Sequence, residues 1–147
     1  MTMDVREDLY TRISEALEDI EEVRHIDLWN RNVEFIEEEE AWARPAVFIE
    51  ILPIRWDRLE SRVEYRCEPR VHLHIVTDWT EGSEGHPGIG RLLSLPEKIH
   101  QKLAGLNGET FYQLDLVESI TNHNHGEIVE MIEAYEAFGS RIFEENK

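Results

Sequence analysis

The stretch "RPAVFIEILPIRW", Arg44–Trp56, decides the fold that this sequence predicts. Seven of the eight residues in Ala46–Pro53 are apolar, and Glu50 is the only charged one among them. A short apolar run bounded by prolines is typical of a strand that is buried on both faces, within a sheet or at an interface. Because Arg55 and Trp56 follow directly, we expect this strand to lead out of the core into a charged, aromatic segment.

The N-terminal segment predicts an amphipathic helix over about Asp4–Glu21. Its apolar residues recur at the 3.6-residue period and form one stripe. They are Leu9, Ile13, Ala16, Leu17 and Ile20. Asp4 and Glu7 have the spacing of a capping box, so the helix is expected to begin at Asp4.

A second helix is predicted over Ser94–Leu106, after a Gly- and Pro-rich loop at residues 80–90. Ser94 and Glu97 have capping-box spacing, and a proline is tolerated in the first turn of a helix. Gly108 follows the last apolar residue, so we expect it to form a left-handed C-cap.

Three further segments alternate between apolar and polar residues and predict strands. They are Trp29–Ile36, Glu64–Trp79 and Phe111–Ile120. Within the second of them, Val71, Leu73 and Ile75 should share one face. Pro69 has no backbone N–H to donate, so this strand should be an edge or carry a bulge there.

The segment at residues 127–143 has apolar residues at helical spacing, yet it follows a predicted turn at residues 121–126 that would pair it with the preceding strand. We predict a strand. The order of elements then indicates one α+β domain over residues 1–147, with a mainly antiparallel sheet of four to five strands. Two helices should pack on one face of that sheet.

The composition excludes several classes of function. The chain has 15 basic and 32 acidic residues, a formal net charge of −17. Tight binding to nucleic acid needs Lys and Arg on phosphates, and anionic membranes attract basic segments, so neither partner is expected. No apolar run approaches the ~20 residues that span a bilayer. An acidic, amphipathic N-terminus is unlike a signal peptide, so we expect the cytoplasm of a bacterial cell.

His72 and His74 are the candidate metal ligands. They lie two apart on a predicted strand and therefore point to the same face, where two imidazoles could share an ion. His123, His125 or an acid could supply a third ligand. The chain lacks a Cys/His framework of zinc spacing, so the interpretation favoured is a polar sheet face with no metal and no cofactor.

Catalytic motifs are not recognisable. The acids around Cys67 should raise the pKa of its thiol, which disfavours a nucleophile. The sequence contains no phosphate-binding loop with a lysine, no serine elbow motif and no carboxylate pair set in an apolar stretch. We therefore predict that the protein is not an enzyme.

A local basic patch follows the buried strand. Arg and Trp are enriched where protein interfaces carry their binding energy. The predicted interface residues are Arg55, Trp56, Arg58, Arg62 and Arg66, with Arg44 and Arg70 as flanks. We expect a hairpin arm that offers these side chains to the acidic surface of another copy. The alternative is a solvated hairpin with scattered charges.

The order of elements resembles that of the phage tail-terminator and minor tail (head–tail joining) proteins. The segments "PAVFIE" and "VHLHIVT" carry the resemblance best. It covers nearly the whole chain, but it rests on a pattern and brings no functional residue with it. The resemblance implies a structural protein: a ring-forming adaptor, often hexameric, at the end of a tail, with tail-tube and head-connector proteins as partners.

In that picture the protein moves from the bacterial cytoplasm into the virion, and its acidic residues line a channel through which DNA passes without sticking. Two alternatives remain open. One is a small metal-dependent enzyme that uses His72 and His74. The other is a bacterial interaction domain with no phage origin.

Overall fold

The computed structural model describes residues 4–29, 43–60, 63–78, 89–125 and 128–142. In chain order the described elements are α1 (Val5–Glu18), β1 (His25–Leu28), β2 (Ala46–Ile51), β3 (Trp56–Arg58), β4 (Glu64–Cys67), β5 (Arg70–Asp78), α2 (Ile89–Leu103), β6 (Phe111–His125) and β7 (Ile128–Ile142). The class is α+β, as predicted. Neither helix is long and apolar enough to cross a membrane within the part of the chain that is described.

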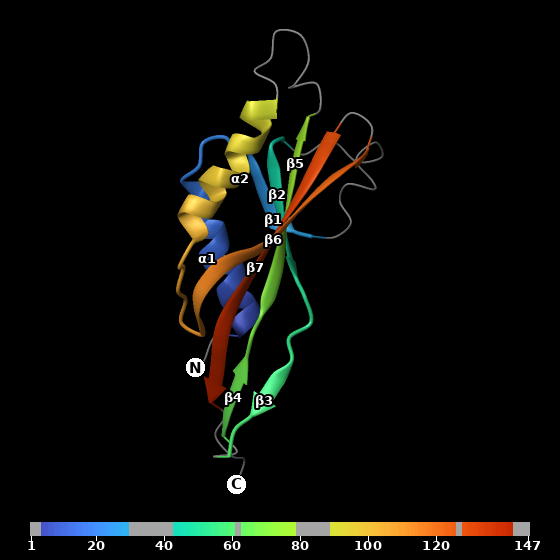
Figure 1. The fold of residues 1–147 in the computed structure, drawn as a ribbon. Coiled ribbons are helices and arrows are strands. Elements are labelled where there is room, and N and C mark those ends of the chain that lie inside the picture. Colours follow the sequence, from blue (N-terminus) through green and yellow to red (C-terminus); the bar gives the residue numbers. More distant parts are fainter. Residues whose placement is uncertain (1–3, 30–42, 61–62, 79–88, 126–127, 143–147) are drawn as a thin grey trace.

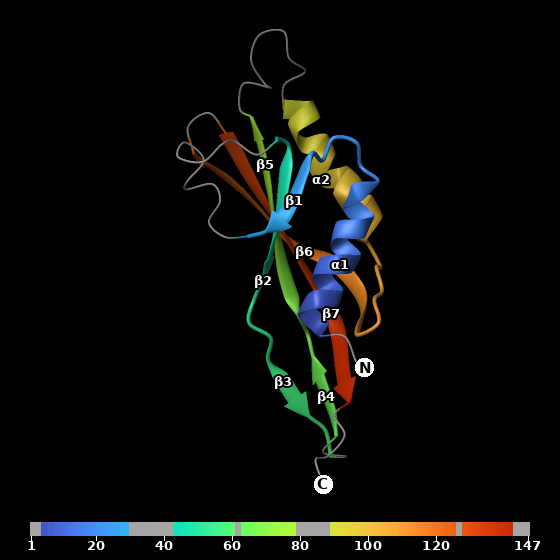
Figure 2. The same cartoon turned by 180° about the vertical axis from the view of Figure 1, so that it is seen from behind.

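Both helices lie on the same face of the sheet (Figures 1 and 2). One apolar core fills the space between them and the sheet. The helices contribute Leu9, Ile13, Leu17, Ile99 and Leu103, and the sheet contributes Val47, Ile49, Val71, Leu73, Ile75, Met131 and Tyr135. The apolar stripe predicted for the first helix is therefore its buried face. We call the opposite side of the sheet the open face.

The sheet is larger than predicted and mixed. The described strands form one seven-stranded sheet in the order β1-β2-β5-β7-β4-β3, and β6 pairs with the other edge of β7. The pair β1–β2 is parallel, and the other pairs are antiparallel. The prediction of four to five antiparallel strands was wrong because breaks near Pro53 and Pro69 divide two long extended segments into β2, β3, β4 and β5.

The opening stretch forms β2, whose first four residues are buried. Val47 and Ile49 join the main core, whereas Ala46 and Phe48 form a second, smaller cluster on the open face with Val76. β2 lies between β1 and β5, so its backbone is paired on both edges. The prediction of a strand buried on both faces is confirmed for these residues.

The strand predicted near Trp29–Ile36 falls almost entirely outside the described residues, and the described strand in this region is β1. β1 ends at Leu28, and residues 30–36 lie outside the described part of the chain. The Trp29 N–H donates to the Ile49 carbonyl at 2.9 Å, so the chain still follows β2 at this point.

The start of α1 agrees with the sequence. Asp4 is the N-cap, and its carboxylate accepts a hydrogen bond from the Arg6 backbone N–H at 2.8 Å. The Arg6 side chain also contacts it, and these hydrogen bonds lower the pKa of Asp4 to about 2. The helix ends at Glu18 rather than Glu21, because the next residues form a turn.

The boundaries of α2 differ from the prediction. The helix begins at Ile89, so Ser94 is not its cap, and Pro96 lies inside it. It ends at Leu103, and the left-handed backbone falls at Gly105, with φ +76°, rather than at Gly108. The predicted C-cap was placed too late because apolar Leu106 belongs to the following turn, where it bridges to Leu114.

Gly108 is needed for a close approach instead. A Cβ at this position would lie 2.4 Å from the Phe111 ring and 2.5 Å from Asp8 Oδ2. Asp8 is a fully buried carboxylate of α1 that accepts hydrogen bonds from the backbone N–H and the hydroxyl of Thr110, both at 2.7 Å. Gly108 therefore lets the turn before β6 close onto the start of the helix.

The strand predicted over Glu64–Trp79 is divided at Pro69 into β4 and β5, where the sequence predicted an edge or a bulge. Both strands are paired on two sides, so neither is an edge. The Pro69 carbonyl accepts a hydrogen bond from Ala137 N–H at 3.0 Å, so the break stays attached to β7. Val71, Leu73 and Ile75 share the core face, as predicted.

The last two strands are longer than expected. β6 continues through the predicted turn to His125, and β7 covers the ambiguous C-terminal segment, which confirms the strand prediction there. Helical spacing was misleading because β7 is paired on both edges and uses both faces. Met131 and Tyr135 enter the core, whereas Phe138 is exposed.

Glu133 is buried on the core face of β7. Desolvation raises the pKa of its carboxyl, although the Ser119 hydroxyl donates to it and His100 lies nearby. The folded protein therefore binds a proton at Glu133 more readily than the unfolded chain does. Glu133 lowers the free energy of unfolding as the pH rises above the ordinary pKa of a glutamate.

We expect Glu133→Gln to raise the free energy of unfolding by up to about 1 kcal/mol at neutral pH. Gln can still accept from Ser119, so the gain should disappear below the ordinary carboxyl pKa, where the wild-type group is protonated in both states. Urea unfolding at pH 4 and pH 7, with exposed Glu97→Gln as the control, checks this. A gain independent of pH would contradict it.

Candidate functional site

The strands β3 and β4 form an arm at one end of the molecule (Figure 1). β3 pairs with β4, and β4 pairs with the end of β7, where Cys67 lies opposite Gly139. All three residues of β3 are exposed, and Trp56 keeps 37% of its surface in solvent. The segment after the buried strand thus carries a tryptophan outward, as its sequence indicated.

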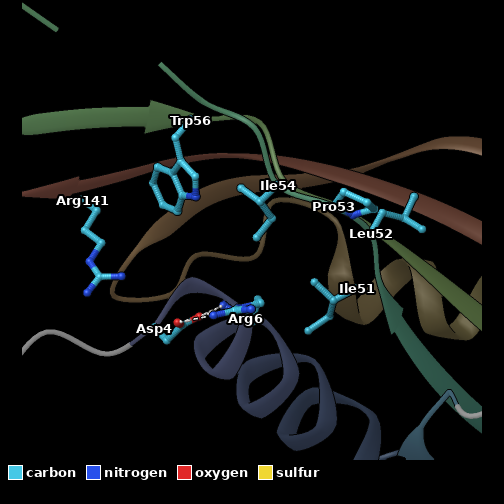
Figure 3. Close-up of a pocket in the computed structure, with 8 residues that line it drawn as sticks. All are labelled: Asp4, Arg6, Ile51, Leu52, Pro53, Ile54, Trp56 and Arg141. Carbon is cyan, nitrogen blue, oxygen red and sulfur yellow. Dashed lines mark hydrogen bonds and ion pairs between the residues drawn. The ribbon is translucent and has the colours of Figure 1, made fainter. Parts of the chain in front are cut away.

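A pocket of about 390 Å³ lies between this β3–β4 arm and the start of α1. It is lined by Asp4, Arg6, Ile51, Leu52, Pro53, Ile54, Trp56 and Arg141. Figure 3 shows Trp56 and Ile54 on one side of the pocket and the Asp4–Arg6 pair on the other. The pocket lining combines an aromatic ring, aliphatic side chains, one carboxylate and two guanidinium groups.

The structure describes four of the five predicted interface residues, and all four lie on or beside the β3–β4 arm. Arg55, Arg58 and Arg66 are exposed on or beside the β3–β4 arm, and Trp56 lines the pocket. Arg62 lies outside the described residues.

A polar cluster occupies the open face where β2, β5 and β7 lie side by side. Register places Glu50 of β2 opposite His72 of β5. His74 Nε2 lies 2.8 Å from Glu50 Oε1, and His74 Nδ1 lies 2.8 Å from Glu130 Oε2. His72 Nδ1 lies 3.6 Å from the same Glu50 oxygen. We call Glu50, His72, His74 and Glu130 the polar cluster.

The centre of the polar cluster is shielded from solvent. The side chains of His74 and Glu130 are 6% and 4% exposed. The Trp29 ring stacks on the His74 ring with centroids 3.7 Å apart and an interplanar angle of 3°. Ionised carboxylates only accept hydrogen bonds. The two hydrogen bonds of His74, one to Glu50 and one to Glu130, therefore need one proton each.

Arg70 borders the polar cluster. Its Nε donates to His72 Nε2 at 3.3 Å, and its terminal nitrogens pair with Glu118 at 2.7 Å and Glu136 at 3.3 Å. The pKa of His72 is lowered, chiefly because burial disfavours the charged ring. The Glu50 charge opposes this shift, whereas Arg70 adds to it.

The structure brings together the two histidines that the sequence singled out and supplies the acid that the sequence could not name. Glu50, His72 and His74 each offer one ligand atom, and these three atoms lie within 4.8 Å of one another. The other candidates, His123 and His125, lie in the last residues of β6. Glu50 was missed because its position opposite His72 depends on the register of β2 against β5.

Cys67 is buried, and burial raises the pKa of its thiol to about 11. The predicted direction is correct, but its main cause is desolvation rather than the neighbouring acids. A thiol of this kind stays protonated and unreactive at neutral pH.

Large apolar side chains are exposed along β6 and β7. Tyr112 and Phe138 stack with centroids 5.7 Å apart while keeping 50% and 45% of their surfaces in solvent. Val117, Ile120 and Ile142 are also exposed. The stacked pair of Tyr112 and Phe138 is thus an exposed aromatic feature of the β6–β7 pair.

No protein-family model matches this chain, and no curated protein matches its sequence. In fold the chain is similar to a solved structure described as "Virion of native gene transfer agent (GTA) particle", with a TM-score of 0.63. The two sequences are 8% identical, and the match covers 95% of this chain and 99% of the other. At this identity the likeness shows a shared fold.

Proposed function

We propose that this chain is a structural protein of a phage-type virion, a ring-forming adaptor of the tail-terminator or head–tail joining type. The observation that carries the proposal is the likeness in fold to a chain of a gene transfer agent virion over nearly the full length of both. The order of elements supports the same class.

The surface of the monomer supports self-association. The β3–β4 arm offers Trp56 and exposed arginines, on a chain whose net charge is −17. An arginine-bearing arm and an otherwise acidic surface are complementary, so copies arranged head to tail would close into a ring, for which we propose six copies. Tail-tube and head-connector proteins are then the expected partners.

The excess negative charge suits a ring around DNA. A wall that carries carboxylates repels phosphates and releases no condensed counterions, so it would let DNA pass without binding it. The same charge argues against contact with anionic membranes. Such a protein would assemble in the bacterial cytoplasm and remain in the virion.

Oligomeric state tests the proposal. We expect sedimentation at high protein concentration and moderate salt to show a closed oligomer. Arg55→Glu combined with Arg58→Glu should shift it to monomer, because both substitutions place like charges at the contact. The matched control is Lys98→Glu with Lys102→Glu, which changes the net charge equally on an exposed face of α2.

A wild-type protein that stays monomeric under these conditions would contradict self-association. Equal effects of the arm variant and the α2 variant would show that only net charge matters. Genes for capsid, portal and tail-tube proteins next to the coding sequence would support the virion role independently.

A further inference from the structure

We propose that Glu50, His72 and His74 bind a divalent transition-metal ion, with zinc as the leading candidate, on the open face of the sheet. One ligand atom from each of the three residues lies within 4.8 Å of the other two. The ring nitrogens that face the Glu50 carboxylate are His72 Nδ1 and His74 Nε2, and we assign them as the ligands. The inference is independent of the virion role.

The two distances from Glu50 to the histidines are close to those of a zinc site. Zinc bonds of about 2.0–2.2 Å place neighbouring ligand atoms about 3.3 Å apart in a tetrahedron. Glu50 Oε1 lies 2.8 Å from His74 Nε2 and 3.6 Å from His72 Nδ1, on either side of that value. Two imidazoles and one carboxylate leave the fourth position to water or to a group from a partner molecule.

The second contact of His74 is the one that a metal-bound histidine usually makes. Its Nδ1 lies 2.8 Å from the buried Glu130 carboxylate, which would hold the ring proton there and direct Nε2 toward the ion. Trp29 stacks on the ring and restricts its rotation. The proton that His74 now shares with Glu50 would leave as the ion enters, so binding should release protons.

Arg70 opposes binding. Its Nε donates to His72 Nε2 at 3.3 Å, which places the proton of a neutral His72 ring on Nδ1, the nitrogen that the ion needs. If the ion bound Nδ1, the ring proton would have to move to Nε2. The Nε2 proton would then point at the Arg70 guanidinium, which is also a donor. The guanidinium must therefore turn away and rely on Glu118 and Glu136.

The experiment titrates untagged, metal-stripped protein with zinc chloride by calorimetry and with cobalt by absorption spectroscopy. We expect one equivalent of zinc, a cobalt spectrum of a four-coordinate nitrogen–oxygen site, and a zinc-dependent rise in Tm. Glu50→Gln and His72→Gln should each abolish stoichiometric binding, and Glu130→Gln should weaken it by about 10- to 100-fold. His100→Gln, on α2, is the matched control and should bind as wild type does.

Arg70→Gln separates a metal site from a simple hydrogen-bonded network, because it should tighten zinc binding by at least about tenfold if one opposing charge is removed. Circular dichroism checks that each variant folds. No stoichiometric binding by the wild type would overturn the proposal. Binding that survives both Glu50→Gln and His72→Gln would place the ion elsewhere and overturn it equally.

Discussion

Replacing His74 by leucine is expected to lower the free energy of unfolding by about 3 kcal/mol. His74 lies between two carboxylates at 2.8 Å, and one of them, on Glu130, is 4% exposed. Leucine fills a similar volume but offers no proton. Glu130 would then lose this hydrogen bond while remaining buried, and a buried polar group that loses a hydrogen bond costs more stability than the hydrogen bond itself contributes.

The double variant His74→Leu with Glu130→Leu distinguishes this explanation from loss of packing. If the buried carboxylate is the cause, removing it as well should recover most of the stability, so the double variant should be more stable than His74→Leu alone. Urea unfolding in the presence of a chelator measures both without a contribution from metal. Additive losses in the double variant would show that packing dominates.

Asp8→Ala is expected to destabilise the fold by a similar amount, about 3 kcal/mol. Asp8 is fully buried, and one of its oxygens accepts both hydrogen bonds from Thr110 at 2.7 Å. Its other oxygen lies 3.5 Å from Arg12 Nε. Alanine would leave the backbone N–H and the hydroxyl of Thr110 without this acceptor.

Asp8→Asn is the matched control for charge. The amide oxygen can still accept from Thr110, whereas the amide nitrogen would face Arg12 and lose the ion pair, so the expected loss is about 1 kcal/mol. Arg12 is partly exposed, which limits that term. Equal losses for alanine and asparagine would indicate that the charge rather than the hydrogen bonds holds α1 to the start of β6. Thermal and urea unfolding provide the measurements.

Local sequence patterns predicted the structure correctly where a residue's environment depends only on its neighbours in the chain. The helix α1 was predictable from the spacing of its apolar residues and from its Asp4 cap. The doubly buried strand was predictable from "AVFI" alone, and the break in the next strand from Pro69, because a missing N–H interrupts a ladder in any context. Since side chains alternate along a strand, placing His72 and His74 on one face also needed only sequence.

Tertiary structure decided what depends on pairing between distant segments. The apolar residues of β7 have helical spacing, yet the segment forms a strand. Neighbouring strands on both of its edges satisfy its backbone hydrogen bonds, and side chains on both of its faces are buried by packing. Ser94 lies inside α2 rather than at its start, because a cap worth about 1 kcal/mol does not by itself fix where a helix begins. Glu50 and Glu130 joined the histidines only through the registers of β2 and β7 against β5, and a shift of one residue would have turned each carboxylate to the other face.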